Sequence, residues 1–410
     1  MHRYRFGIEE EYFLVNRQSA APRSELPKPY MAAAQKRLGE RLTTEILQSQ
    51  IEVATPPLTS SADALAELAR YRSVLTEVGR DHGVGIIAAG THPLAQPQQQ
   101  RMTRKRRYSK VISDLGMVGL GNPISGLHVH VEVPEPDLRV EIMHRLVPFL
   151  PLLLALSTSS PFWCGYPTGL LGYRNAANDA LPRTGFPEMF RNLSEYETYV
   201  KTLVDAGIVP NATYVWWALR PSLQHPTLEL RITDCCTAIA DSVAIAALFR
   251  ALVRHAIHHP ELNATYSAVH RALVEENRWR AQRYGTDGTY IDLVSFEPVS
   301  FRSWLDSVIA MVAPHVDHLG IEDDIQHLMS IPKRGTSAHL QLEYFRGLRK
   351  FGRSPREAIG DVTKWLRTST ETGDFTARNN EPKKVREPFA TLRAPGLRRQ
   401  APSACRCTAS

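Results

Sequence analysis

Residues 7–15 read GIEEEYFLV, a strand-like segment that carries three consecutive glutamates. Side chains alternate between the two faces of a β-strand. One face would carry the apolar side chains together with Glu10, whereas the other would carry Glu9 and Glu11 about 7 Å apart. Two carboxylates at this spacing repel each other unless a positive charge lies between them. The segment therefore predicts a strand with one core face and one charged face.

Three later segments repeat this pattern. The charged residues that share a face in them are Glu52 in SQIEVATPP (49–57), His128, His130 and Glu132 in SGLHVHVEV (125–133), and Glu229 and Arg231 in TLELRITD (227–234). A single charged strand face of this kind could simply be exposed to solvent. Four of them predict an α+β fold with a single, mostly antiparallel, curved sheet, whose charged concave face forms the active site and whose other face is covered by helices.

Hydrophobic periodicity and turn residues place the individual elements. Strands are expected at 5–15, 45–55, 84–90, 126–133, 213–220 and 226–233. Helices are expected at 62–82, 139–157, 194–206, 241–259, 265–283, 301–318, 337–350 and 355–368.

The chain has 410 residues, and we expect one catalytic domain over 1–370 followed by a tail. Residues 371–410 hold eight Lys/Arg against four Asp/Glu and few large apolar residues, so this tail is expected to be basic and disordered. A second basic run, RMTRKRRYSK (101–110), lies inside the domain. It lacks interleaved aromatics and any known reader motif, so it favours solvated surface or a phosphate-substrate site, and no nucleic acid is expected as a partner.

The longest apolar stretch, LVPFLPLLLAL (146–156), is short for a membrane span and contains Pro148 and Pro151. It is better explained as a buried helix, so no membrane association is expected. The chain has five cysteines, two of them adjacent (Cys235 and Cys236), which implies no disulfide framework. A reducing cytoplasm fits this composition.

The charged face has the chemistry of a divalent-cation site. Mg²⁺ prefers oxygen ligands, and Mn²⁺, the alternative ion, also accepts an imidazole. Several carboxylates with a histidine and an arginine match a site that neutralises nucleotide phosphates. The sequence contains no GxxxxGK[ST] loop and no convincing G-x-G-x-x-G after a strand, so the sheet itself would have to bind ATP.

Ten motifs in order between about residue 5 and residue 370 resemble the carboxylate–amine ligase family, also labelled glutamate–cysteine ligase type 2. They are GIEEE, SQIEVATPP, AAGTHPLAQ, SGLHVHVEV, LLALSTSSPFWCG, TGLLGYRN, LPRTGFP, WWALRPS, TLELRITD and ENRWRAQRYGTDG. This family is similar to the glutamate–cysteine ligases and, more distantly, to glutamine synthetase. The resemblance implies an antiparallel sheet whose concave face holds metal ions and ATP.

The resemblance also implies roles for individual residues. The implied metal ligands are Glu9, Glu11, Glu45, Glu52, His128 and Glu229. Glu229 and Arg231 are the implied catalytic residues, with Arg231 contacting phosphate. Arg174, Arg183 and Arg220 are candidates to clamp a substrate carboxylate or phosphate, and Arg174 and Arg220 join Arg231 as expected ATP-binding residues. Glu10 falls on the core face and receives no metal role.

The implied reaction is ATP-dependent amide formation through an acyl phosphate, with weak glutamate–cysteine ligase activity giving γ-glutamylcysteine. The partners are then small molecules, an amino-acid carboxylate and an amine such as cysteine, and a homodimer is plausible. Two other functions remain open. A zinc hydrolase would bind its metal through His128 and His130, although the further histidine ligands would have to come from predicted helices. A non-enzymatic binding protein would use the basic tail but would leave the embedded carboxylates unexplained.

Overall fold

The computed structural model describes residues 4–103, 115, 122–188, 190 and 192–375. Its central sheet has seven strands in this part of the chain. They are β1 (Phe6–Asn16), β2 (Leu42–Thr44), β3 (Gln50–Ala54), β4 (Val84–Ile87), β5 (Leu127–Glu132), β8 (Leu219–Pro221) and β9 (Thr227–Leu230). Two small hairpins lie outside it, β6 (Phe162–Trp163) with β7 (Tyr166–Pro167) and β10 (Thr289–Ile291) with β11 (Pro298–Ser300).

The strand that contains GIEEE lies at the centre of the sheet. The strand order is β2-β3-β1-β5-β9-β8, and each recorded pair is antiparallel. One edge of β1 pairs with β3, while its other edge is shared between β5 at its start and β4 at its end. The predicted α+β class and the antiparallel sheet are confirmed.

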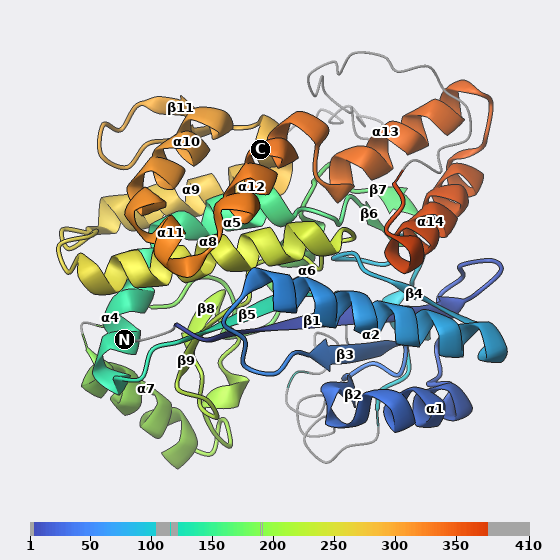
Figure 1. The fold of residues 1–410 in the computed structure, drawn as a ribbon, viewed down its shortest axis with the longest axis horizontal. Helices are drawn as coiled ribbons and strands as arrows, with labels where there is room; N and C mark the ends of the chain where they lie inside the picture. Colours follow the sequence, from blue (N-terminus) through green and yellow to red (C-terminus); the bar gives the residue numbers. More distant parts are fainter. Residues whose placement is uncertain (1–3, 104–114, 116–121, 189, 191, 376–410) are drawn as a thin grey trace, which may run out of the picture.

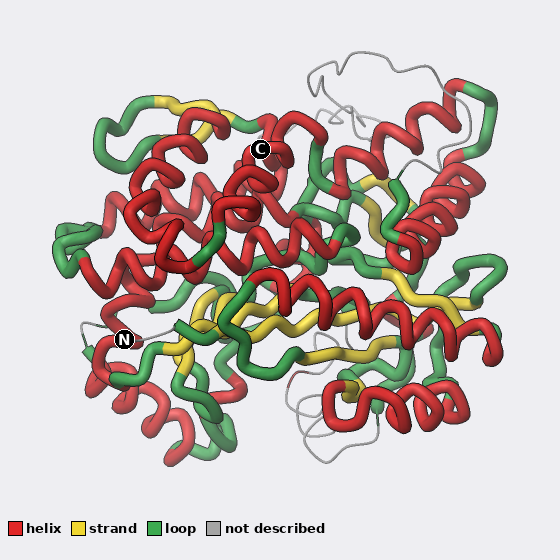
Figure 2. The backbone as a smooth tube through the Cα atoms, in the orientation of Figure 1, coloured by secondary structure: helices red, strands yellow, loops and turns green. Residues whose placement is uncertain are grey.

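Helices cover the sheet and build the rest of the molecule (Figures 1 and 2). The α-helices are α1 (Lys28–Leu38), α2 (Ser61–His82), α4 (Pro136–Leu146), α5 (Leu150–Ser157), α6 (Tyr173–Asn178), α7 (Leu193–Asp205), α8 (Ile239–His258), α9 (Ala268–Tyr284), α10 (Phe301–Val312), α11 (Val316–Leu319), α12 (Glu322–Arg334), α13 (Ser337–Lys350) and α14 (Pro355–Thr372). Short 3₁₀ turns join several of them, including η5 (Ala212–Tyr214) and η7 (Ala313–His315).

Local sequence signals set the ends of α2, which packs beside α8 against the core face of the sheet. The Ser60 side chain accepts a hydrogen bond from the Asp63 N–H at the start of the helix. Gly83 ends it in the left-handed conformation, with φ +63°. The apolar side chains between these caps, among them Leu68 and Leu75, are fully buried.

The core face of β1 contains one charged residue, Glu10, which is fully buried. Its carboxylate accepts hydrogen bonds from Arg72 of α2 at 2.8 and 2.9 Å, from Ser242 of α8 at 2.6 Å, and from Tyr12. The same guanidinium donates to the carbonyl oxygens of Cys236 and Thr237. Glu10 is therefore a structural residue that ties the sheet to two helices, which agrees with leaving it out of the metal site.

A second hydrophobic core covers the opposite face at the end of β1. Phe13 and Val15 pack there with Ile87 of β4 and with side chains of α13 and α14 such as Leu342 and Trp365. Helices thus lie on both faces at this end of the sheet. Around Glu9 and Glu11, however, the same face carries pockets, which agrees with the expectation that helices cover only the other face there.

The structure corrects the expected strand at 213–220. Residues Ala212–Tyr214 form a 3₁₀ turn because the Asn211 side chain accepts a hydrogen bond from the Thr213 N–H at 2.9 Å. The next segment pairs its backbone with a loop, through the N–H of Trp216 to the carbonyl oxygen of Arg183, so regular pairing begins only at Leu219. Helices α1, α6 and α12 were not expected.

The boundary of the tail also changes. Helix α14 continues to Thr372, and the Glu371 side chain is only 3% exposed, with its carboxylate paired to Arg17 at 3.0 Å and to Arg367 at 2.9 Å. Residues 371 and 372 therefore belong to the last helix of the folded body. The rest of the predicted tail from 376 and most of the basic run 101–110 lie outside the described residues.

The segment Pro136–Ser157 is long and apolar enough to cross a membrane by composition. In the fold, 78% of its most apolar window is buried inside the protein. Its two helices, α4 and α5, are separated by a 3₁₀ turn at Val147–Phe149, next to the prolines at 148 and 151. The segment is thus a core element, as predicted.

Candidate active site

Strand register brings the predicted metal ligands together on one face of the sheet. Glu9 of β1 lies directly opposite His128 of β5, and the His128 Nδ1 is 3.3 Å from a Glu9 carboxylate oxygen. Glu11 lies directly opposite Glu52 of β3. Like charges that face each other across a sheet are destabilising, so this second pair favours either a bound cation or a proton on one of the carboxyl groups.

Glu45 completes the acidic cluster from the loop between β2 and β3. Carboxylate oxygens of Glu11, Glu45 and Glu52 lie within 4.8 Å of one another, and so do ligand atoms of Glu9, Glu52 and His128. Desolvation and the neighbouring Glu45 charge raise the pKa of Glu11 to about 7. Desolvation, followed by the charges of Glu9, Glu45 and Glu11, raises the pKa of Glu52 well above its ordinary value.

Glu9 behaves differently from these carboxylates. Although desolvation acts to raise it, hydrogen bonds from His128 and His130 hold the pKa of Glu9 well below its usual range. Desolvation lowers the pKa of His128 to about 4, so this ring is neutral and able to act as a ligand.

The residues present fit a divalent cation. The Nε2 of His128 is buried without a hydrogen-bond partner among the described residues. A Cβ at Gly126 would lie 2.6 Å from that nitrogen and 2.4 Å from Arg174 Nη2, so only glycine leaves room for both side chains. The Gly126 N–H donates to Glu11 at 2.5 Å and orients this carboxylate. Oxygen ligands in this number with one imidazole suit Mg²⁺ or Mn²⁺.

Glu229 lies between two arginines at the other end of the face. The Arg220 guanidinium donates to both of its carboxylate oxygens, at 2.7 and 3.1 Å, and Arg231 donates to one of them. Although desolvation acts to raise it, these two charges lower the pKa of Glu229. Ligand atoms of Glu9, His130 and Glu229 also lie within 4.8 Å of one another. Glu229 thus fixes both arginines and remains within reach of a metal ion near Glu9.

The remaining arginine candidates separate into two groups. Arg174 of α6 is buried, and its Nη1 donates to the carbonyl oxygen of Arg231 at 3.2 Å, while its Nε has no partner among the described residues. Arg183 instead donates from its Nε to the Tyr214 carbonyl oxygen at 3.1 Å and lies over the Trp216 ring. Arg183 is not among the residues that line the pockets described next.

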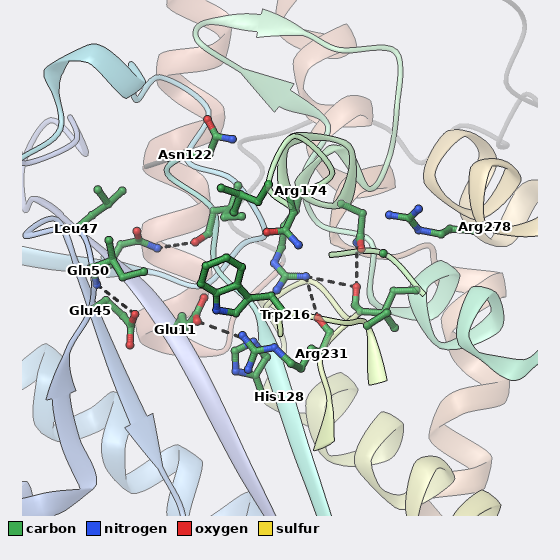
Figure 3. Close-up of a pocket in the computed structure, with 18 residues that line it drawn as sticks. Glu11, Glu45, Leu47, Gln50, Asn122, His128, Arg174, Trp216, Arg231 and Arg278 are labelled. Atoms are coloured by element: carbon green, nitrogen blue, oxygen red, sulfur yellow. Dashed lines mark hydrogen bonds and ion pairs between the residues drawn. The ribbon is translucent and has the colours of Figure 1, made fainter. Parts of the chain in front are cut away.

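One pocket lies beside Glu11 (Figure 3). Glu11 and Glu45 contribute one wall, Arg174 and Arg231 contribute another, and the Trp216 ring lies between them. Its other polar lining residues are Gln50, Asn122, His128, Asn175, Asn178 and Arg278. Trp217, which follows Trp216 in the sequence, is buried and stacks on Tyr199 with ring centroids 5.7 Å apart.

A second pocket opens beside Glu9 on the same face. Its polar lining includes Arg41, Thr55, His130 and His225. Glu9 therefore belongs to one pocket and Glu11 to the other. The acidic cluster thus lies between two pockets, so ligands in either pocket would lie next to it.

Sequence reasoning missed several residues that line the first pocket. Arg278 of α9 and Asn175 of α6 received no role, although both belong to quoted motifs, ENRWRAQRYGTDG and TGLLGYRN. Asn122 lies outside those motifs and had no sequence signal. Its amide donates to the Ala177 carbonyl oxygen at 2.8 Å, which holds it at the pocket wall.

Replacing Glu52 with glutamine is expected to stabilise the metal-free protein by roughly 1 kcal/mol, because it removes one of the mutually repelling carboxylates. The same change is expected to abolish the rise in melting temperature that Mg²⁺ causes in the unmodified chain. Thermal unfolding with and without Mg²⁺ measures both effects. Glu132→Gln is the control, since Glu132 lies on the same strand face but pairs with Arg5 at 2.6 Å. An undiminished Mg²⁺ response in Glu52→Gln would contradict the metal site.

The zinc hydrolase alternative finds no support. His128 and His130 do share a face, as alternation predicts. However, in the part of the chain that the structure describes, the ligand groups that contain either ring are completed by glutamates. Such oxygen-rich groups favour Mg²⁺ over Zn²⁺.

Comparisons with known proteins identify the family of the chain. The model of the family described as "Glutamate-cysteine ligase family 2 (GCS2)" matches residues 5–364. A relative from Bradyrhizobium sp. (strain ORS 278), named "Putative glutamate--cysteine ligase 2", is 42% identical over 367 residues, covering 90% of this chain and 88% of the relative. A relative of the same name from Rhodospirillum rubrum is 42% identical over 368 residues, covering 89% and 95%.

Two solved structures share the fold. The glutamate–cysteine ligase of Francisella tularensis in complex with AMP superposes with a TM-score of 0.64 at 13% identity, covering 91% of this chain and 90% of the other. A bifunctional glutathione synthetase from Pasteurella multocida superposes with a TM-score of 0.62 at 14% identity, covering 90% and 53%. On the family match and the sequence relatives, the chain belongs to glutamate–cysteine ligase family 2, a family of ATP-dependent carbon–nitrogen ligases.

Proposed function

We propose that this enzyme joins the γ-carboxylate of glutamate to the amine of cysteine with hydrolysis of ATP to ADP and phosphate, giving γ-glutamylcysteine at a low rate in the cytoplasm. Family membership supports the reaction class, and the names of the relatives supply the two substrates. The observation that carries the proposal is the acidic cluster with His128, placed between two pockets and facing Arg231.

The residues that would hold Mg²⁺ are Glu9, Glu11, Glu45, Glu52 and His128, with Glu229 as a further ligand toward Glu9. When bound, the metal would offset the charge of the ATP phosphates. Without a cation, desolvation and the neighbouring Glu45 charge raise the pKa of Glu11 and so disfavour its ionised form. The chain thus holds carboxylates ready to accept a cation at the point where the two pockets meet.

Arg231 is the residue placed to act on the phosphoryl group in transfer. Its guanidinium is fixed by Glu229 and lines the pocket beside Glu11. In the proposed reaction a substrate carboxylate oxygen attacks the γ-phosphorus of ATP, ADP leaves, and the amine then displaces phosphate from the acyl phosphate. A fixed guanidinium stabilises the charge that spreads over the phosphoryl oxygens in the first step.

The other arginines position the substrates in this proposal. Arg174 presents a buried Nε without a partner among the described residues, at the wall of the first pocket, where it can bind a carboxylate or phosphate oxygen. Arg220 uses its guanidinium on Glu229 and on the Val215 carbonyl oxygen at 2.7 Å, so we assign it to orienting Glu229. Its expected direct contact with ATP stays a prediction.

A hydroxylamine trap tests the proposal. With ATP, Mg²⁺ and glutamate, hydroxylamine replaces the amine, and a glutamyl hydroxamate is expected to accumulate together with phosphate. Glu9→Ala is expected to abolish both products, whereas a chain that ends at residue 375 is expected to retain them. No hydroxamate from a broad panel of amino and keto acids, with folded protein, would contradict the ligase proposal. Loss of activity in the truncated chain alone would instead give the tail a role.

That the enzyme forms a homodimer also stays a prediction.

A further inference from the structure

Four histidine rings gather at the C-terminal end of α8, away from the active site. His255 and His259 stack with ring centroids 4.1 Å apart, and the His315 ring of η7 lies 5.3 Å from His255. His258 stacks on His315 at 5.9 Å. None of these four histidines is among the residues that line the two active-site pockets. The cluster is therefore separate from the acidic site.

Hydrogen-bond partners determine which ring nitrogens carry a lone pair. Glu261 accepts from the Nδ1 of His259 at 2.9 Å, so the proton lies on Nδ1 and the Nε2 lone pair is free. Arg254 donates to the Nδ1 of His315, which leaves the proton of that neutral ring on its Nε2. This Nε2 lies 3.2 Å from the Nδ1 of His255 and donates to it. The Nε2 proton of His315 thus lies between the His315 and His255 rings, and the His259 ring stacks on His255.

We propose that His255, His259 and His315 form a binding site for a transition-metal ion of the zinc class. One nitrogen from each ring lies within 4.8 Å of the others. The 3.2 Å separation of His255 Nδ1 and His315 Nε2 is close to the ~3.4 Å edge of a tetrahedral zinc–imidazole site. Imidazole nitrogens select zinc, nickel or copper over Mg²⁺, so this site takes a different ion from the acidic cluster.

Two features of the surroundings favour a ligand at this position. His255 and His315 are 8% and 5% exposed, so their nitrogens are largely shielded from water, whereas the His259 side chain is 43% exposed and lies on the solvent side of the site. The Nδ1 of His255 accepts a hydrogen bond from His315, and the Nδ1 of His315 accepts one from Arg254. Each of these nitrogens therefore carries a lone pair rather than a proton, and rings in this unprotonated form are the ones that bind metals.

Arg254 opposes the metal. A metal on the Nε2 of His315 displaces the proton from that atom, and the neutral ring must then carry its proton on Nδ1, where the Arg254 N–H now points. The guanidinium has to turn away, and its charge repels the ion. Arg254 thereby keeps the affinity low, and the bound ion would join the end of α8 to the segment after α10.

The experiment titrates the full chain, made without a histidine tag, with Zn²⁺ in excess Mg²⁺ by calorimetry, and with Co²⁺ by visible absorption. One equivalent of Zn²⁺ is expected to bind and to raise the melting temperature. His259→Gln is expected to lower the affinity about 100-fold, and Arg254→Gln, whose amide oxygen can accept the Nδ1 proton, to raise it roughly tenfold. The opposite signs separate a built site from general surface binding.

His318→Gln is the matched control, since His318 is exposed on the adjacent α11 outside the ligand set. It is expected to leave Zn²⁺ affinity and the Co²⁺ spectrum unchanged. Absence of Zn²⁺ binding, or equal binding by the unmodified chain, His259→Gln and His318→Gln, would overturn the proposal. Because His259 is partly exposed, its variant should remain folded. None of these readouts requires ligase activity, so they stand or fall separately from the proposed function.

Discussion

Replacing Arg231 with lysine is expected to lower kcat by about a thousandfold, the size of effect seen when a fixed donor to a transferring phosphoryl group is removed. Lysine keeps the charge but loses the planar fork that Glu229 orients. Steady-state release of ADP, measured with saturating substrates, gives kcat and KM. Because the contact strengthens in the transition state, we expect the loss in kcat and little change in KM for ATP.

Arg220→Lys is the matched control for this change. Arg220 also binds the Glu229 carboxylate, yet it does not line the pocket beside Glu11. We expect its variant to lose roughly tenfold in kcat through the orientation of Glu229 alone. A variant Arg231→Lys that keeps its kcat and only raises KM would show that this guanidinium binds substrate equally in ground and transition states, and would contradict its catalytic role.

Breaking the buried ion pair of Glu10 and Arg72 is expected to reduce the free energy of unfolding by about 3–5 kcal/mol, the usual cost of leaving one partner of such a pair uncompensated. Glu10 is fully buried and Arg72 is 3% exposed, so water cannot replace the lost partner. Chemical denaturation of Glu10→Gln and of Arg72→Met measures the effect. The double variant is expected to recover part of the loss, because it leaves no unpaired charge.

Arg37→Gln provides the comparison for this prediction. Arg37 pairs with Glu77 at the same 2.8 Å distance, but both side chains are almost half exposed. Its removal is expected to cost less than about 1 kcal/mol. Equal losses for the exposed and the buried pair would contradict the structural role given to Glu10.

The strand faces were predictable because they follow from a local rule. Period-two alternation separates Glu9 and Glu11 from Glu10, and the structure confirms both faces. The same rule placed His128 and His130 together. It required no knowledge of partner strands, since alternation is a property of an extended backbone.

Alternation alone could not predict where the strand near Trp216 begins. The segment 213–220 has a strand-like composition, yet its backbone groups bond to a loop that is remote in sequence, at Arg183 and Gly185. Tertiary hydrogen bonds override local propensity there. A tertiary contact also ties Glu371 to the body, since its partner Arg17 lies at the other end of the chain, whereas Arg367 is one turn away in the same helix.

The sequence by itself determined the antiparallel α+β fold, the charged strand face and the family, because these depend on alternation and on motif order along the chain. Only the tertiary structure decided which charges compensate one another. In the fold, Glu45 from a loop lies beside Glu11 and Glu52. Glu229 pairs with two arginines, and Arg278 lines the pocket beside Glu11. These outcomes depend on strand register and on contacts between distant segments, and neither is encoded in any single stretch of sequence.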